Sequence, residues 1–107
     1  YKGQFGLETH IFDERAIEFL VRAQALVDSH NANFSPEFLT FDTGGRRYQR
    51  IWLGTPVSRH VYCFLQFDNG DVLRAESWKK PAMHARSNIF DEDFGMSGVT
   101  KYGGKHL

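Results

Sequence analysis

Alternating apolar and polar residues predict a β-hairpin in the middle of the chain, between Arg59 and Trp78. In its first strand, side chains at every second position would point to the same face of a sheet. This strand ends at Asp68-Asn69-Gly70, which has the composition of a tight turn because Asn and Gly tolerate positive φ angles. The rest of the predicted fold is arranged around this hairpin.

The register of the hairpin is predicted from the apolar residues that it would bring together. A three-residue loop would place Leu65 opposite Leu73, with Val61 and Cys63 on the same face. A two-residue loop would instead place Leu65 opposite Arg74. Because a shift of one residue turns a whole set of side chains to the other face, we expect the three-residue loop.

This register leaves a second face that is aromatic and charged together. A fully solvated sheet face does not normally carry so many rings, so we interpret it as a ligand or interface face. The residues assigned to it are Tyr48, Arg50, Trp52, Tyr62, Phe64, Arg74 and Trp78.

An amphipathic helix is predicted ahead of the hairpin, over residues 14–30. Apolar residues recur at helical spacing from Ala16 to Val27, and Asp13 has the side chain of an N-cap. A helix of this kind should pack on the apolar face of the sheet.

Two further strands are expected between the helix and the hairpin, over residues 38–43 and 46–53, with a turn at Gly44-Gly45. The predicted fold is therefore α+β, with one main helix on a four-stranded antiparallel meander. Residues 1–107 form a single domain with a core over about 11–78.

The segment 79–107 is expected to be a long and mostly irregular tail. A structureless stretch of this length is uncommon in a compact domain unless it is functional or disordered. It carries apolar residues such as Ile89, Phe90 and Val99. We therefore expect it to be ordered, and to lie on the aromatic second face or on a neighbouring subunit.

Composition narrows the functional classes. Lys and Arg together number 13, as do Asp and Glu, so the chain lacks the basic excess of proteins that bind nucleic acid by bulk charge. The single cysteine, Cys63, is expected to be a buried structural thiol. No signal peptide is expected, and the sequence has no apolar run near the roughly 20 residues of a membrane span. We expect a soluble cytoplasmic protein without membrane contact.

The densest group of polar residues follows the hairpin. It contains the candidate catalytic residues His84, Arg86 and Asp91, with His84 as a general base and Arg86 as a group that holds a carboxylate or phosphate. The alternative is that the basic residues fold back on the acidic ones in structural ion pairs. Five histidines are scattered without metal-site spacing, although distant residues can still converge. We expect no metal and no cofactor.

Several short stretches in the last third of the chain carry a family resemblance. They are His84-Ala85-Arg86, Asn88-Ile89-Phe90-Asp91 and Tyr102-Gly103, together with Gly70-Asp71-Val72-Leu73 and Ser77-Trp78. This part of the chain resembles small uncharacterised proteins of bacteriophages and marine metagenomes. Such proteins have no function to transfer. The resemblance implies a viral protein that acts in the cytoplasm of a bacterial host.

Three functions fit these observations. The first is a small phage-type accessory or structural protein that works through contacts with an unknown protein partner, or as a homodimer. The second is a binder of single-stranded nucleic acid, whose bases would stack on the aromatic face while nearby cations contact phosphate. Those cations would be Arg46, Arg47, Arg50, Arg74 and Lys79. The third is an enzyme centred on His84, Arg86 and Asp91.

Overall fold

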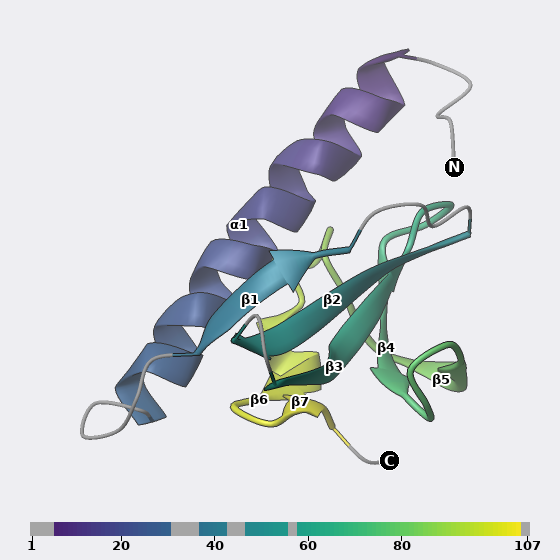
Figure 1. Ribbon diagram of the computed structural model, residues 1–107. Coiled ribbons are helices and arrows are strands. Elements are labelled where there is room, and N and C mark those ends of the chain that lie inside the picture. The colour runs from purple at the N-terminus through teal and green to yellow at the C-terminus, as the bar shows by residue number, and fades with distance from the viewer. Residues whose placement is uncertain (1–5, 31–36, 43–46, 56–57, 106–107) are drawn as a thin grey trace.

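The computed structural model describes residues 6–30, 37–42, 47–55 and 58–105, with the backbone alone for 6–10. One helix packs against an antiparallel sheet, which confirms the predicted α+β class (Figure 1). The sheet face that the helix covers is called the inner face below, and the opposite one the outer face.

Helix α1, Gly6–His30, presents one apolar side to the inner face. Its buried side chains are spaced three or four positions apart and are Phe12, Ala16, Phe19, Ala23 and Val27. The expected N-cap at Asp13 is wrong, because the helix begins earlier. Phe12 explains the difference, since its ring lies 5.3 Å from that of Phe67, centroid to centroid, and extends the packed side by one turn.

Five strands form the sheet, and every neighbouring pair is antiparallel. Their bounds are β1 Phe38–Phe41, β2 Tyr48–Thr55, β3 Ser58–Gln66, β4 Asp71–Ala75 and β5 Pro81–Asn88, and they follow one another in chain order. The sequence predicts the first four, and the fifth comes from the segment expected to be irregular. The predicted turn at Gly44-Gly45 lies outside the described residues.

Strand β5 is the last strand of the sheet and pairs with β4. The side-chain amide of Asn88 fastens it by donating to the carbonyl of Asn69 at 2.8 Å and to the carboxylate of Asp71 at 2.9 Å. Its side chains are exposed or half-buried throughout. An edge strand of this kind has no alternation of apolar residues, so the pattern of the sequence did not reveal it.

The register between β3 and β4 differs from the expected one. Leu65 pairs with Val72 and Phe64 with Leu73, so the prediction that Leu65 faces Leu73 is wrong. The loop begins one residue earlier than expected, at Phe67. The side chains of all four paired residues are buried. The expected and the observed register, which differ by one residue, would therefore both bury apolar side chains. The apolar pattern therefore could not fix the register here.

A β-bulge in β3 turns the side chain of Tyr62 to the inner face. Ile51 pairs with Cys63 while the next residue, Trp52, pairs with Val61, so Tyr62 is the extra residue. Tyr62 is buried in the core cluster with Cys63. Its predicted place on the second face is therefore wrong.

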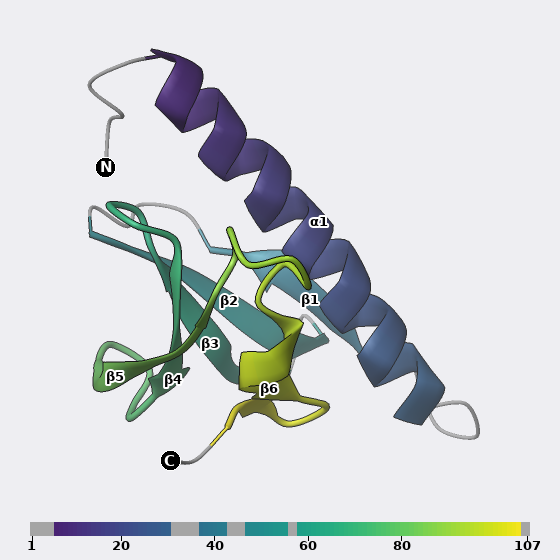
Figure 2. The same ribbon diagram turned by 180° about the vertical axis from the view of Figure 1, so that it is seen from behind.

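The chain beyond β5 lies on the inner side of the sheet, next to α1 (Figures 1 and 2). It forms the short 3-10 helix η1, Met96–Gly98, and a hairpin of β6, Val99–Thr100, and β7, Gly103–Gly104. Ile89 and Val99 are buried in the core cluster beside the helix residues. The expectation that this segment lies on the aromatic second face is therefore wrong. One helix leaves part of the inner face uncovered, and the C-terminal segment completes it.

Candidate interaction surface

The outer face carries most of the residues assigned to the second face from the sequence. Tyr48, Arg50, Trp52, Phe64 and Trp78 meet there through shared ring and guanidinium contacts. Arg47 and Arg59 join them; Arg47 was expected among the cations of this face, whereas Arg59 was missed. The bulge at Tyr62 explains Arg59, because every residue of β3 that precedes the bulge points to the face opposite to the one that simple alternation predicts.

Arginine side chains lie between the aromatic rings. The guanidinium carbon of Arg59 is 4.5 Å from the ring centroid of Trp52 and 5.7 Å from that of Trp78. The guanidinium carbon of Arg50 is 4.9 Å from Trp78 and 5.9 Å from Phe64. These are cation–π distances, and together the five side chains form what we call the arginine–aromatic ladder.

Two further side chains, those of Tyr48 and Arg47, extend the ladder from Phe64 and are counted as part of it below. The rings of Tyr48 and Phe64 meet edge to face, with centroids 6.3 Å apart and an interplanar angle of 75°. The guanidinium carbon of Arg47 lies 5.8 Å from the ring centroid of Tyr48. Alternating rings and cations therefore extend over one side of the sheet.

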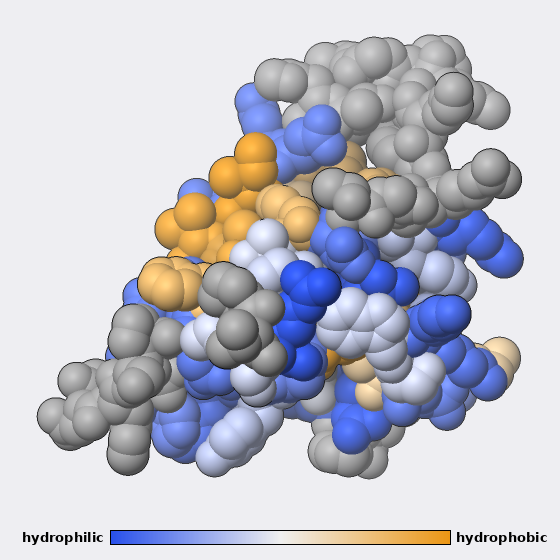
Figure 3. Space-filling view, viewed as in Figure 1, coloured by the Kyte–Doolittle hydropathy of each residue, from blue (hydrophilic) through white to orange (hydrophobic). Residues whose placement is uncertain are grey.

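The ladder is anchored at its centre and open to solvent at its rim. Phe64 is 2% exposed, and Arg50 is held by an ion pair with Asp42. Trp78 is 37% exposed and Arg59 is an exposed residue. Figure 3 shows pale and blue side chains side by side over the sheet, whereas the hydrophobic orange patch lies over the helix. The outer face is thus cationic and aromatic rather than purely apolar.

Comparison with known proteins gives a family without an assigned function. Residues 9–105 match the family of unknown function DUF7717. The chain belongs to this family. No curated protein and no solved structure was found to match the chain. The match spans the helix from residue 9 onward, the whole sheet and the C-terminal hairpin, so the DUF7717 domain has the fold described above.

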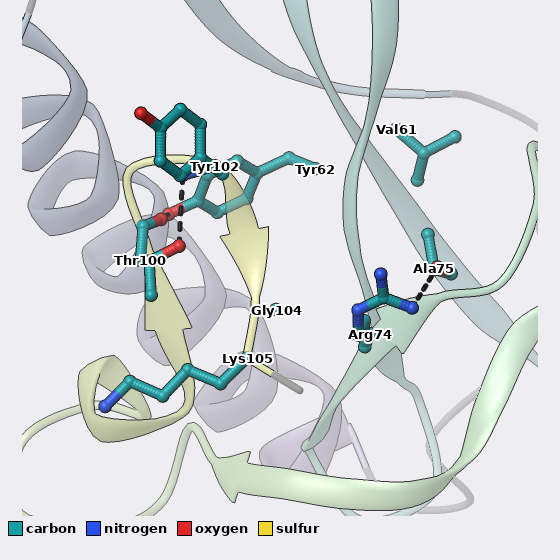
Figure 4. A pocket seen from close by; sticks show the side chains of 8 residues that line it. All are labelled: Val61, Tyr62, Arg74, Ala75, Thr100, Tyr102, Gly104 and Lys105. Carbon is teal, nitrogen blue, oxygen red and sulfur yellow. Dashed lines mark hydrogen bonds between the residues drawn. The ribbon is translucent and has the colours of Figure 1, made fainter. Parts of the chain in front are cut away.

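Two predicted members of the second face lie elsewhere in this DUF7717 domain. Tyr62 and Arg74 line a pocket of about 490 Å³ between β3, β4 and the C-terminal hairpin (Figure 4). The hydroxyl of Tyr62 donates to the carbonyl of Thr100 at 2.6 Å. Burial raises the pKa of Tyr62, with a smaller contribution from the neighbouring Cys63, so the hydroxyl stays protonated as a donor.

The three candidate catalytic residues have separate structural partners. Arg86 donates from Nε to the carbonyl of Lys105 at 2.7 Å, and the Asp91 carboxylate accepts from the backbone N–H of Asn88 at 3.1 Å. His84 is exposed on β5. The Arg86 guanidinium also donates to the backbone carbonyl of His84, but within the described part of the chain no contact joins the three side chains to one another. Arg86 and Asp91 thus fasten the C-terminal segment, and the enzyme hypothesis gains no geometric support.

The remaining titratable groups suggest no metal chemistry in the part of the DUF7717 domain that the structure describes. Among those residues, no three His, Cys, Asp or Glu side chains lie together so that they could hold a metal ion. His10 and His106 lie outside the described side chains. Cys63 is fully buried, as expected of a structural thiol, and burial raises its pKa. None of the described helices is long and apolar enough to cross a bilayer.

Proposed function

We propose that this DUF7717 protein is a small accessory or structural protein, of the bacteriophage type, that binds a protein partner through its outer face. The observation that carries the proposal is the arginine–aromatic ladder on a sheet face that no described segment covers. Trp, Tyr and Arg are the residues that most often dominate the binding energy of protein interfaces.

The charge of the outer face indicates the chemistry of the partner. It holds three guanidinium groups, those of Arg47, Arg50 and Arg59, and the Asp42 carboxylate that pairs with Arg50. Guanidinium groups bind carboxylates through paired hydrogen bonds. A second copy of the chain, bound face to face, would set arginines against arginines. We therefore favour a partner that presents Asp and Glu side chains over a homodimer through this face.

Binding of single-stranded nucleic acid is the second candidate. Rings and cations on one open sheet face are the parts of a stacking platform. Two observations make it second. Guanidinium groups already lie over the rings of Trp52 and Trp78, which leaves less ring surface for bases. The formal net charge of the chain is also zero.

Intrinsic fluorescence can test both candidates, because the only two tryptophans of the chain belong to the ladder. The protein is titrated at low salt with a glutamate-rich peptide and, separately, with a mixed-sequence DNA oligonucleotide of the same length. We expect the peptide to change the emission saturably and the Arg59→Glu variant to lose that response. Lys101→Glu is the matched control, since Lys101 lies in the C-terminal hairpin on the inner side.

Each other outcome has a definite meaning. Tighter binding of the oligonucleotide, with quenching that Trp52→Ala removes, would replace the protein partner with nucleic acid. A doubled mass in light scattering that Arg59→Glu abolishes would make the partner a second copy. A response to neither probe, without self-association, would remove the outer face as a binding surface for acidic partners.

A further inference from the structure

A pocket lies between β3, β4 and the C-terminal hairpin, and the role proposed for it below is independent of the function proposed for the ladder. It encloses about 490 Å³, within the range of sites for small molecules. Figure 4 shows its lining side chains around an open space, with Tyr62, Thr100 and Tyr102 on one side and Val61, Arg74 and Ala75 on the other.

The walls of this pocket are held at fixed positions. The Tyr62 hydroxyl donates to the Thr100 carbonyl at 2.6 Å, which ties the hairpin to β3. A Cβ at Gly103 would collide with the carbonyl oxygen of Tyr62, and one at Gly104 would lie 2.7 Å from Cα of Arg74. The hairpin backbone therefore rests directly on two neighbouring strands, and the pocket is preformed.

The charges around the pocket favour an anion. Arg74 belongs to the wall, while Lys105 lies at the rim with its ammonium group directed away from Arg74 in Figure 4. Lys101 stands 5.1 Å from the ring centroid of Tyr102. Among the described residues that line the pocket, none is acidic. Arg74 is therefore the cation placed at the open space, where its guanidinium also donates to the carbonyl of Ala75 at 3.3 Å. The ammonium groups of Lys101 and Lys105 lie further out, and all three charges favour an anion over a cation.

Tyr102 provides a flat surface beside these cations. Tyr102 is 70% exposed although it belongs to the pocket lining. An edge contact with His30, whose ring centroid is 5.8 Å away, helps to hold it at the end of α1. We propose that the pocket binds a small planar organic phosphate, with the phosphate at Arg74 and the flat ring stacked on Tyr102.

Titration by two-dimensional amide NMR tests this proposal with three probes, adenosine monophosphate, adenosine and inorganic phosphate. We expect the monophosphate to shift the amide signals of Thr100 and Gly104 saturably, and more tightly than either other probe. Arg74→Met keeps the aliphatic stem and removes the charge, so we expect about tenfold weaker binding, the effect of one charge-assisted contact. Arg59→Met, on the outer face, is the matched control and should bind unchanged.

Four results would overturn the proposal. They are no saturable shift of the pocket signals up to about 10 mM, a concentration above which binding is negligible, equal binding of adenosine, equal binding of inorganic phosphate, and unchanged affinity of Arg74→Met. Dispersed amide spectra of every variant show that it is folded. Tyr102→Ala removes only an exposed ring, so it provides a second variant that tests stacking should Arg74→Met fail to fold.

Discussion

The two faces of the sheet bury aromatic residues by different means. On the inner face, α1 and the C-terminal hairpin cover the strands, and Phe19 and Tyr62 are at most 1% exposed. On the outer face no described segment covers the strands, and guanidinium groups stack over the rings of Trp52 and Trp78 instead. Rings packed under the helix stay buried as long as the domain is folded. Exposed guanidinium groups, in contrast, can give up their contacts with the rings and bind the side chains of a partner instead. The contrast is therefore between a packed inner face and an outer face that no described segment covers, and the outer face is the surface proposed above for binding.

The largest effect is expected from the inner face. Phe19→Ala should lower the free energy of unfolding by about 3–5 kcal/mol, because it leaves a cavity at a fully buried position. Trp52→Ala on the outer face should cost about 1–2 kcal/mol, because its ring is only partly buried. Chemical denaturation of both variants provides the measurement. Equal losses would contradict the division between the two faces.

The C-terminal hairpin should be the next most sensitive part of the inner side. Gly103 has a φ of 127°, and a Cβ there would collide with the carbonyl of Tyr62. We expect Gly103→Ala to lower the unfolding free energy by about 2 kcal/mol. Lys105 is an exposed residue of the same segment, and Lys105→Ala should change the free energy of unfolding by less than about 0.5 kcal/mol. Thermal melts compare the two, and an unaffected Gly103→Ala would mean that the hairpin is not docked.

Alkaline pH should weaken the inner face selectively. The pKa of Tyr62 is raised by burial, so above about pH 10 the unfolded chain ionises there while the folded chain does not. Stability from this group is therefore complete below about pH 10 and falls above it, by at most about 1.4 kcal/mol per pH unit. Tyr62→Phe should remove the part of this dependence that comes from the hydroxyl and leave the part that comes from the Cys63 thiol, whose pKa burial also raises. Parallel pH curves for both proteins would refute the burial of the hydroxyl.

The smallest effect should come from single contacts of the ladder. A double-mutant cycle with Arg59→Met and Trp52→Leu should give a coupling energy of about 0.5–1 kcal/mol, as for a partly exposed cation–π pair. The same cycle with Arg59→Met and Phe19→Leu should give none, because those residues lie on opposite faces. A coupling near zero in the first cycle would reduce the ladder to coincidental proximity.

The features that could be predicted from the sequence are those that rest on apolar residues recurring regularly over many positions. The helix side with Phe19 and Ala23, and five of the seven outer-face residues, followed from spacing alone. The prediction failed where a single inserted residue changes the direction of the side chains that precede it. The bulge at Tyr62 reverses part of β3, which misplaced both Tyr62 and Arg59. Strand β5 was missed because an exposed edge strand has no apolar period, although Asn88 fixes it through side-chain hydrogen bonds.

The central claim is that the outer face is open and its tryptophans are accessible. Acrylamide quenching of the two single-tryptophan variants, Trp52→Phe and Trp78→Phe, tests this directly at several protein concentrations. We predict efficient quenching of both, stronger for Trp78, which is 37% exposed, and independent of concentration. Emission that resists acrylamide in the dilute protein would show that a part of the chain covers the outer face, and would contradict the account.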